Sequence, residues 1–322
     1  MEEDSYAEIQ VLETEEAAQD DLGVQPPSKC LSYSTGRFRN GATGLCNIGP
    51  TSCLNSLLQT LYMNKDFTGI LCRIGDPDDN VRPDGQLPYE LLALFEAMQN
   101  SKEDAVSPYQ VLHCLQILRA TVFAQNDVAE VFSTLLSLLL QTVPSPHLAE
   151  KMRALYTIPM EECVMCQRCS QQRITHKDRI AIPLQISHSK FHRNLTLERT
   201  LFRYFRSQET YEDRNPCPKC ECSRVVKMTH LRSLPRTFSI HLKRLSRKNP
   251  LQKVNRTVSF PLVLDLLEVL DSEHLPRKEY SLVSWDDVKC TYGNTTFRWG
   301  LTACLLVYVQ SEAATSDTKP PL

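Results

Sequence analysis

Hydrophobic residues in the first half of the chain recur with the period of an α-helix. In SCLNSLLQTLYM (52–63) the residues Leu54, Leu57, Leu58, Leu61 and Tyr62 follow the spacing i, i+3, i+4, i+7, i+8, which predicts one buried helix face. Further helices are predicted in LPYELLALFEAMQ and SPYQVLHCLQIL, each with a proline suited to the first helical position, and in DVAEVFSTLL, which opens with capping-box spacing. The stretch from Gly44 to about Leu155 is therefore expected to form a helical lobe.

After about Met160 the pattern changes to segments rich in β-branched residues and punctuated by Pro, Asn and Asp. These segments are RITHKDRIAIPLQIS, RVVKMTHLRSLPRTFSIHLKRL, VNRTVSFPLVLDL and ACLLVYVQ. A helical lobe followed by a mostly antiparallel lobe is an α+β arrangement.

Composition and charge argue against some classes of function, namely nucleic-acid binding and membrane association. The chain has 322 residues, is 42% hydrophobic and carries a net charge of −2, so it can bury a sizeable core and shows no general attraction to nucleic acid or to anionic membranes. Its longest apolar run, VFSTLLSLLLQTV, is too short to span a bilayer, and the first residues lack a secretory signal pattern. We therefore expect a cytoplasmic protein, with the nucleus as the alternative location, and no nucleic-acid or membrane partner.

The two ends of the sequence are expected to be disordered. Nine acidic residues precede the first basic residue, Lys29, so residues 1–40 are interpreted as a disordered acidic N-terminus. The tail, residues 311–322, is expected to be disordered as well.

Two C-x2-C pairs form the most specific pattern from spacing alone. Cys166 and Cys169, together with Cys217 and Cys220, have the arrangement of two knuckles that close a tetrahedral zinc site. Cys163 and Cys222 lie close enough to leave the register open, although 166/169 is preferred because the alternative leaves Cys169 unused. Four reduced cysteines without metal are the other interpretation. A site of four thiolates has no open coordination position, so the zinc would be structural.

The segment GLCNIGPTSCLNSLLQ, which begins at Gly44, combines a glycine-containing turn with the start of an amphipathic helix. A helix N-terminus stabilises a thiolate and the oxyanion formed after its attack, so this place suits nucleophilic catalysis. The alternative is an ordinary helix start, with Thr51 or Ser52 as N-cap and Cys53 as a small buried hydrophobic residue.

That segment resembles the cysteine box of the ubiquitin-specific proteases, which has the form G-L-x-N-x-G-x-T-C-[YC]-x-N-S-x-L-Q. Further resemblances follow in order: QNDVAEVF to the family's Q-x-D-A-x-E-F, the two C-x2-C pairs to its zinc-bearing fingers, LPRTFSIHLKR to L-P-x-x-L-x-I-H-L-K-R-F, and then FPLVLDL and CLLVY. The resemblance implies a papain-like fold over residues 41–310, with a helical thumb (41–156), β fingers (about 160–230) and a β palm (about 231–310). It also implies thiol-dependent removal of ubiquitin or of the interferon-induced tandem ubiquitin-like modifier from conjugates, with interferon-signalling proteins as possible partners.

Two departures from the family pattern concern catalysis. The alignment puts Ser52 at the nucleophile position and Cys53 beside it, while Asn47 matches the asparagine of the oxyanion hole. A serine hydroxyl depends entirely on an adjacent base. Cys53 points about 100° away around a helix.

The family's histidine box is the second departure. Lys278-Glu279-Tyr280 should open it, yet Ser281 continues with the segment that follows the box, so the base and its orienting partner are not found. Each of the eight remaining histidines is interpreted as structural or as a surface residue, His241 as structural within an apolar strand. The junction is what a skipped exon or a faulty gene model would leave. We expect exposed sheet edges, an opened palm core and marginal folding.

Three functions remain: an isopeptidase that uses Cys53 and an unforeseen base, a catalytically silent protein that binds a modifier or signalling partners, and a zinc-ribbon nucleic-acid binder suggested only by the cysteine pairs and by the basic clusters KRLSRK and RYFR. The silent binding protein is favoured for the chain as written.

Overall fold

The computed structural model describes residues 43–48, 51–75, 86–103, 105–118, 127–186, 195–244, 254, 256–270, 278–283 and 303–311. The expected disorder of residues 1–40 concerns residues outside this part, as does that of the tail apart from Ser311. Within this part, no helix is long and apolar enough to cross a bilayer.

The first half of the described chain is a helical lobe, as its hydrophobic period predicts. Its elements are β1 (Gly44–Leu45), α1 (Ser52–Met63), α2 (Lys65–Cys72), η1 (Arg73–Gly75), α3 (Leu87–Asn100), β2 (Ala105–Val106), α4 (Tyr109–Ile117), α5 (Val128–Thr142) and α6 (Pro146–Tyr156). Leu54, Leu57, Leu58, Leu61 and Tyr62 are all at most 3% exposed, so the predicted face of α1 is the buried one.

The residues that the sequence predicts at helix starts lie at or within one position of the predicted place. Asp127 caps α5 by accepting a hydrogen bond from the backbone N–H of Ala129, and Pro88 lies in the first turn of α3. Pro108 is the residue that precedes α4 and not its first helical residue.

The second half contains a five-stranded sheet, here called the palm sheet, in the order β11-β12-β13-β9-β5. Its strands are β5 (Ile182–Gln185), β9 (Thr237–Lys243), β11 (Val263–Asp265), β12 (Glu279–Leu282) and β13 (Leu305–Gln310), antiparallel except for the β5–β9 pair. Helices α7 (Leu197–Arg206) and α8 (Leu266–Leu270) contribute to the same core, and the short strands β6 (Leu195–Thr196) and β10 (Val258–Ser259) pair in parallel. The α+β prediction is thus confirmed.

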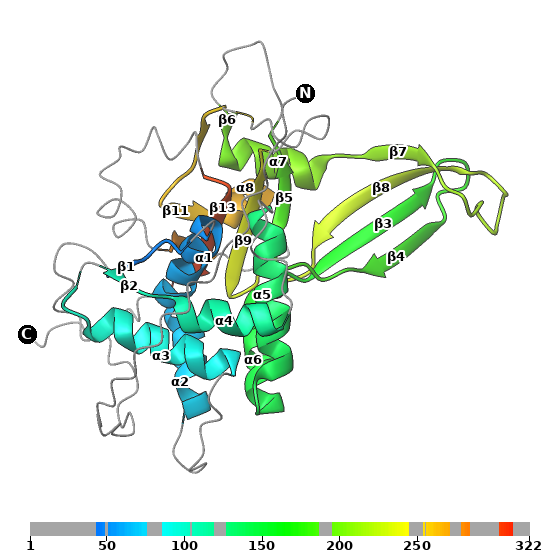
Figure 1. Ribbon diagram of the computed structural model, residues 1–322. Helices are drawn as coiled ribbons and strands as arrows, with labels where there is room; N and C mark the ends of the chain where they lie inside the picture. The colour runs from blue at the N-terminus through cyan, green and yellow to red at the C-terminus, as the bar shows by residue number, and fades with distance from the viewer. Residues whose placement is uncertain are drawn as a thin grey trace, which may run out of the picture.

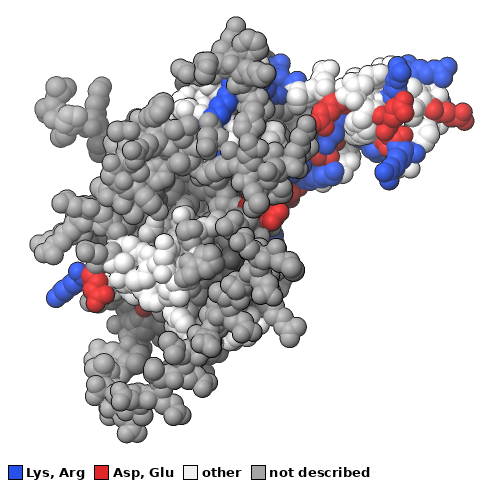
Figure 2. All heavy atoms as spheres, turned by 45° about the horizontal axis from the view of Figure 1, so that its top comes forward, with Lys and Arg blue, Asp and Glu red and all other residues white. Residues whose placement is uncertain are grey.

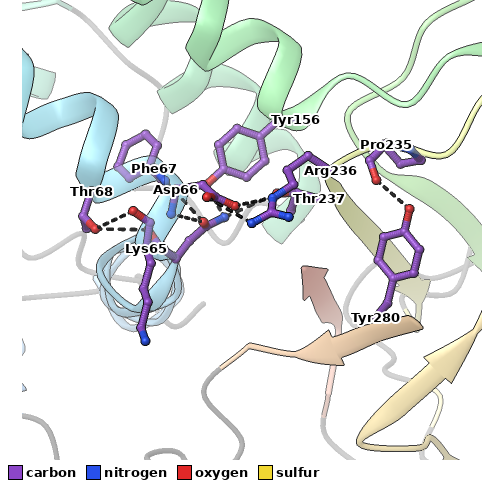
Figure 3. Close-up of polar contacts among 10 residues, drawn as sticks. Lys65, Asp66, Phe67, Thr68, Tyr156, Pro235, Arg236, Thr237 and Tyr280 are labelled. Carbon is purple, nitrogen blue, oxygen red and sulfur yellow. Dashed lines mark hydrogen bonds and ion pairs between the residues drawn. The ribbon is translucent and has the colours of Figure 1, made fainter. Parts of the chain in front are cut away.

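The palm sheet is continuous across the Tyr280/Ser281 junction. Both residues lie in β12, where Tyr280 pairs with Leu264 on one side and Gln310 on the other. The Tyr280 side chain is fully buried, and its hydroxyl donates to the carbonyl of Pro235 at 2.6 Å (Figure 3). The expectation of an opened palm core is therefore wrong for the described residues, because the strands beside the junction pair with one another. Among the described residues, the terminal strands of this sheet are β11, one strand from the junction, and β5.

A second sheet, here called the fingers sheet, projects from the rest of the molecule (Figure 1). Its order is β4-β3-β8-β7, formed by β3 (Met160–Cys166), β4 (Gln172–His176), β7 (Glu209–Glu212) and β8 (Arg224–Leu231). Side chains of both charge signs cover it (Figure 2), so it does not present the single basic face that nucleic acid would favour.

The base of the fingers sheet is held by one buried carboxylate. Glu162 of β3 is 5% exposed and lies within ion-pair distance of Lys177 (2.6 Å), Lys227 (3.3 Å) and Arg179 (3.6 Å). Burial raises the pKa of Glu162, but the hydrogen bond from Lys177 and the charge of Lys227 outweigh burial and lower this pKa below its ordinary value. The charged form of Glu162 therefore links β3 to β8 and to the segment after β4 through ion pairs.

The helical lobe and the palm sheet meet at Asn64, which is 1% exposed. The Asn64 side chain accepts from the N–H groups of Asp66 and Phe67 and donates to the hydroxyls of Tyr156 (3.2 Å) and Thr237 (3.5 Å). Next to it, Arg236 forms a two-point ion pair with Asp66 at 2.6 and 3.2 Å (Figure 3). This joint fixes α2 and α6 against β9.

Candidate functional site

The loop before α1 is held on two sides. β1 pairs with β2, and the N–H of Cys46 donates to the carbonyl of Val106 at 2.9 Å. From the helix side, the Asn55 amide donates to the Cys46 carbonyl and to Oδ1 of Asn47, each at 3.0 Å. Asn47 is an exposed residue whose Oδ1 is engaged by Asn55, and its role as an oxyanion-hole donor stays a prediction.

Helix α1 begins at Ser52, beside this loop. Thr51 is the N-cap by position, but its side chain makes no capping hydrogen bond and instead accepts from the N–H of Ile48 at 3.3 Å. No acidic residue lies in the first turn. The helix start thus keeps the partial positive charge that a developing anion needs. For Ser52 the structure describes the backbone and not the side chain.

Cys53 is half-buried and packs against the hydrophobic core of the helical lobe. Burial raises the pKa of the Cys53 thiol, and the nearby Cys304 and Asp127 raise it further because each is negative when ionised. Reactive cysteines lie beside cations that lower the pKa. The surroundings of Cys53 therefore favour a neutral thiol.

His241 is buried in β9 and donates through Nε2 to Oδ1 of Asp127 at 2.7 Å. Burial lowers the pKa of His241, although the Asp127 charge acts in the opposite direction, so the ring is held neutral. Asp127 is shared, since it also caps α5. The structure thus gives His241 a partner that orders it in place.

The other histidines within the described part of the chain lie at the surface. His113 and His147 are exposed in the helical lobe, and His176 and His230 are exposed on the fingers sheet. His188, His192 and His274 lie outside the described residues.

Cys304 and Asp127 are site residues that the sequence analysis did not single out as such. The sequence predicts Asp127 as a helix cap, which the structure confirms, and it shows Cys304 only as part of a terminal motif. The only available signal was the polar QNDVAE segment before an apolar helix, and nothing in it shows which distant residue Asp127 meets.

The second candidate centre is a cluster of the four cysteines predicted from spacing. The sulfur atoms of Cys166, Cys169, Cys217 and Cys220 all lie within 4.8 Å of one another. Cys163 lies in β3 and Cys222 contacts the carbonyl of Arg224, and neither belongs to this group. The cluster corresponds to the preferred register.

The two knuckles have the same backbone form. Cys169 is followed by Ser170 and Cys220 by Glu221, and both of these residues have φ of 56°. The N–H of Ser170 donates to the Cys166 carbonyl, and the N–H of Glu221 to the Cys217 carbonyl. Each pair of sulfurs is thereby turned toward a common point.

The donor set suits a metal ion. Tetrahedral coordination with bonds of about 2.3 Å places sulfurs about 3.8 Å apart, and the Cys166–Cys220 and Cys169–Cys217 sulfurs are each 3.5 Å apart. Backbone hydrogen bonds at Cys169 and Arg168 lower the pKa of Cys166 to about 6. A backbone hydrogen bond at Cys222 lowers that of Cys220, but burial and the neighbouring thiols outweigh it and raise the value to about 12. A cation would allow all four to ionise together, so the cluster could hold a metal ion.

The chain is similar in sequence to a known family and to known proteins. The family model described as ubiquitin carboxyl-terminal hydrolase matches residues 43–296. Ubl carboxyl-terminal hydrolase 18 of Homo sapiens is 31% identical over 325 residues, which cover 85% of this chain and 87% of that protein. The Mus musculus protein of the same name is 31% identical over 321 residues, with 84% and 86% covered.

Among solved structures, the SAGA DUB module with Ubp8, Sgf11, Sus1 and Sgf73, bound to monoubiquitin, is similar. Its TM-score is 0.66 at 18% identity, with 85% of this chain and 70% of that chain covered. At that identity the likeness concerns the fold.

The alignment with the human relative also carries information on length. It extends over 325 residues but uses only 85% of this chain's 322 residues, so the relative has residues without a counterpart here. Absence of the histidine box between Tyr280 and Ser281 would leave such residues in the relative without a counterpart.

Proposed function

The chain belongs to the ubiquitin carboxyl-terminal hydrolase family, and from this premise we propose that it binds ubiquitin or a ubiquitin-like modifier without cleaving it. Its relatives are named as hydrolases, and the family resemblance implies thiol-dependent isopeptidase activity. This chain retains the fold of the family, whereas its candidate site is poorly equipped for the chemistry.

The observation that carries the proposal is the electrostatic setting of Cys53. Burial, Cys304 and Asp127 all raise the pKa of this thiol, whereas thiol catalysis needs a pKa lowered toward the working pH. Ser52, at the aligned nucleophile position, would need a base close to its hydroxyl. These two residues therefore argue against turnover.

The second support is the hydrogen bond of His241. The imidazole is buried and neutral, and its Nε2 hydrogen is donated to Asp127. Asp127 in turn belongs to the cap of α5, so moving His241 toward a substrate would leave a partly buried carboxylate short of a partner. We assign to His241 the structural role of joining α5 to β9.

The ligand class is supported by the relatives. The human and mouse relatives carry "Ubl" in their names, and the similar solved structure is bound to monoubiquitin. The interferon-induced tandem ubiquitin-like modifier and ubiquitin itself are the ligands we propose, with interferon-signalling proteins as further partners in the cytoplasm or nucleus.

The decisive experiment pairs binding with covalent capture. Full-length chain is titrated calorimetrically with each modifier and is separately incubated with modifiers that carry a C-terminal propargylamide. We expect reversible binding, no adduct and no release of a fluorogenic C-terminal amide. Ser52→Cys is the matched variant, because it places a thiol at the aligned position. Cys53→Ala is the control for adventitious labelling.

Two outcomes would overturn the proposal in different ways. An adduct at Cys53 of the unaltered chain would establish the isopeptidase alternative. An absence of heat with every modifier, at protein concentrations up to about 100 μM, would remove modifier binding as the function.

We also propose that the metal of the four-cysteine cluster is zinc, held by Cys166, Cys169, Cys217 and Cys220 in a structural role. Four thiolates at these spacings are the donor set of a closed zinc site. Such a site supplies folding free energy to the knuckles that join β3 to β4 and β7 to β8.

Elemental analysis tests the zinc assignment. We expect one zinc per chain, which a chelator removes together with ordered amide signals of the fingers sheet. Cys217→Ser should abolish the zinc, whereas Cys222→Ser should retain it, because Cys222 lies outside the cluster. Zinc retained by Cys217→Ser and lost by Cys222→Ser would show that the ligand set is wrong.

A further inference from the structure

A groove of about 560 Å³ lies between α7 and β11, away from both centres described above. Helix α7 lines it with Glu198, Arg199, Phe202 and Arg203, and the chain at β11 lines it with Pro261, Val263, Leu264 and Asp265. The RYFR cluster of the sequence, which the proposed function does not use, ends this stretch of α7.

Large apolar side chains are exposed at this groove. Phe202 is 44% exposed and Val263 53%, and the adjacent Leu262 is 49% exposed. On its other face α7 buries Leu197, Leu201 and Phe205, so its hydrophobic requirement within the fold is already met. Apolar side chains gathered at one exposed place mark an interaction site.

The groove also borders an open sheet edge. β11 is the terminal strand of the palm sheet, and β12 occupies only one of its sides. Among the described residues its other side has no strand partner. Such an edge can accept an added extended segment through backbone hydrogen bonds.

The charged side chains on α7 indicate which charges the added segment should carry. Arg199 and Arg203 are four residues apart on the same helix face, and neither has an ion-pair partner among the residues that the structure describes. Arg206, one turn further, lies over the Phe202 ring at 5.4 Å. The lining also holds two acidic side chains, Glu198 and Asp265, and the Asp265 carboxylate accepts from the N–H of Leu267 at the start of α8. With Arg206 counted, the basic side chains at the groove outnumber the acidic ones by three to two. The groove therefore suits an extended segment that is both apolar and acidic.

We propose that this groove is the docking site for the chain's own acidic N-terminal segment, EEDSYAEIQVLETEEAAQDD. Within it, Ala7, Ile9 and Val11 alternate with Glu8 and Gln10, the pattern of a strand with one apolar face. Added beside β11, that face covers Phe202 and Val263, and the surrounding glutamates neutralise Arg199 and Arg203.

The tether is long enough for this contact. An extended chain spans ~3.3 Å per residue, so the stretch from Glu13 to the first described residue, 43, reaches up to about 100 Å. A domain of this size has a radius of gyration of about 19 Å. Docking within one chain is therefore sterically accessible, and the tether raises the local concentration of the segment at the groove.

Photo-crosslinking in the full-length chain tests the proposal. Phe202→p-benzoylphenylalanine places the reactive group in the groove, and mass spectrometry should locate its crosslinks in residues 2–21. Mixing unlabelled with isotope-labelled protein should give crosslinks within single chains only. The double variant Arg199→Glu/Arg203→Glu should reduce the crosslink yield at least fivefold, and 1 M salt should act in the same direction.

The matched control is Lys151→Glu/Arg153→Glu, which reverses two exposed charges on α6 and should leave the yield unchanged. Circular dichroism establishes that each variant remains folded. Three outcomes would overturn the proposal: crosslinks between labelled and unlabelled chains, which would indicate a second copy; crosslinks confined to other segments or absent; and a yield insensitive to the Arg199 and Arg203 reversal.

Discussion

At the scale of single residues, Cys53 has a position that favours a reactive thiol and an environment that favours a protonated one. Its place one residue into α1 favours a reactive thiol, because the helix N-terminus stabilises negative charge. Its environment has the opposite effect, because burial and two ionisable neighbours of negative charge stabilise the protonated form. A motif can therefore persist while the property that it normally confers is lost.

The raised pKa of Cys53 predicts slow alkylation. At pH 7 we expect Cys53 to react with iodoacetamide at least tenfold more slowly than the exposed Cys46 on the adjoining loop, with the difference narrowing as pH rises above the ordinary thiol pKa of about 8.5. Peptide-resolved mass spectrometry measures both rates in one sample. Asp127→Asn should accelerate Cys53 by removing a negative charge. A Cys53 rate equal to that of Cys46 at pH 7 would contradict this electrostatic description.

The residue-level contacts also show what the sequence could not reveal. The face of α1 and the four clustered cysteines follow from local spacing, and the sequence predicts both correctly. The pairing of Asp127 with His241 and the hydrogen bonds from Asn64 to Tyr156 and Thr237 join residues far apart in the chain. Such contacts depend on how the lobes pack, for which no local pattern exists.

At the scale of elements, the fingers sheet depends on charge at its root and on the cysteine cluster at its knuckles. Strand β4 is exposed along its whole length, so it contributes little hydrophobic burial. A thin sheet of this kind needs interactions other than a core. Glu162 and the cysteine cluster supply them at two separate places.

Glu162→Gln should therefore weaken the molecule in a pH-dependent way. Because the folded pKa of Glu162 is lowered, its contribution is fully present above the unfolded value of about 4.3 and is lost as pH falls below it. We expect the variant to lose about 1–3 kcal/mol of unfolding free energy at pH 7, and the difference to shrink as pH falls from about 4.3 through the lowered folded pKa.

Urea denaturation at pH 7 and at lower pH measures this difference. Glu150→Gln, which removes an exposed pair with Arg153 on α6, is the control and should cost at most about 0.5 kcal/mol. A Glu162→Gln deficit that persists unchanged at pH 3 would show that the carboxylate charge is not its cause.

At the scale of the whole molecule, the joint at Asn64 decides whether the two lobes unfold together. One buried amide caps α2 and binds hydroxyls from α6 and β9, and the Asp66–Arg236 pair lies beside it. A further direct polar contact between the lobes is that of His241 with Asp127. The cooperativity of unfolding should thus be sensitive to this residue.

Asn64→Ala is expected to cost about 2–3 kcal/mol, from the lost helix cap and from buried hydroxyls left without their partner. Calorimetric unfolding should broaden or divide into two transitions, because the lobes are coupled less tightly. Asn100→Ala, at the exposed end of α3, should change the unfolding free energy by less than about 0.5 kcal/mol. A single sharp transition at the original temperature for Asn64→Ala would contradict this role.

The continuity of β12 has a consequence for any longer product of the same gene. Tyr280 and Ser281 are neighbours in one strand, bonded to β11 through Leu264 and Val263 and to β13 through Gln310 and Val309. A polypeptide with additional residues inserted between them cannot keep both halves in that single row. Such a product would interrupt this row, so the residues before and after the insertion would have to pair with β11 and β13 as separate strands.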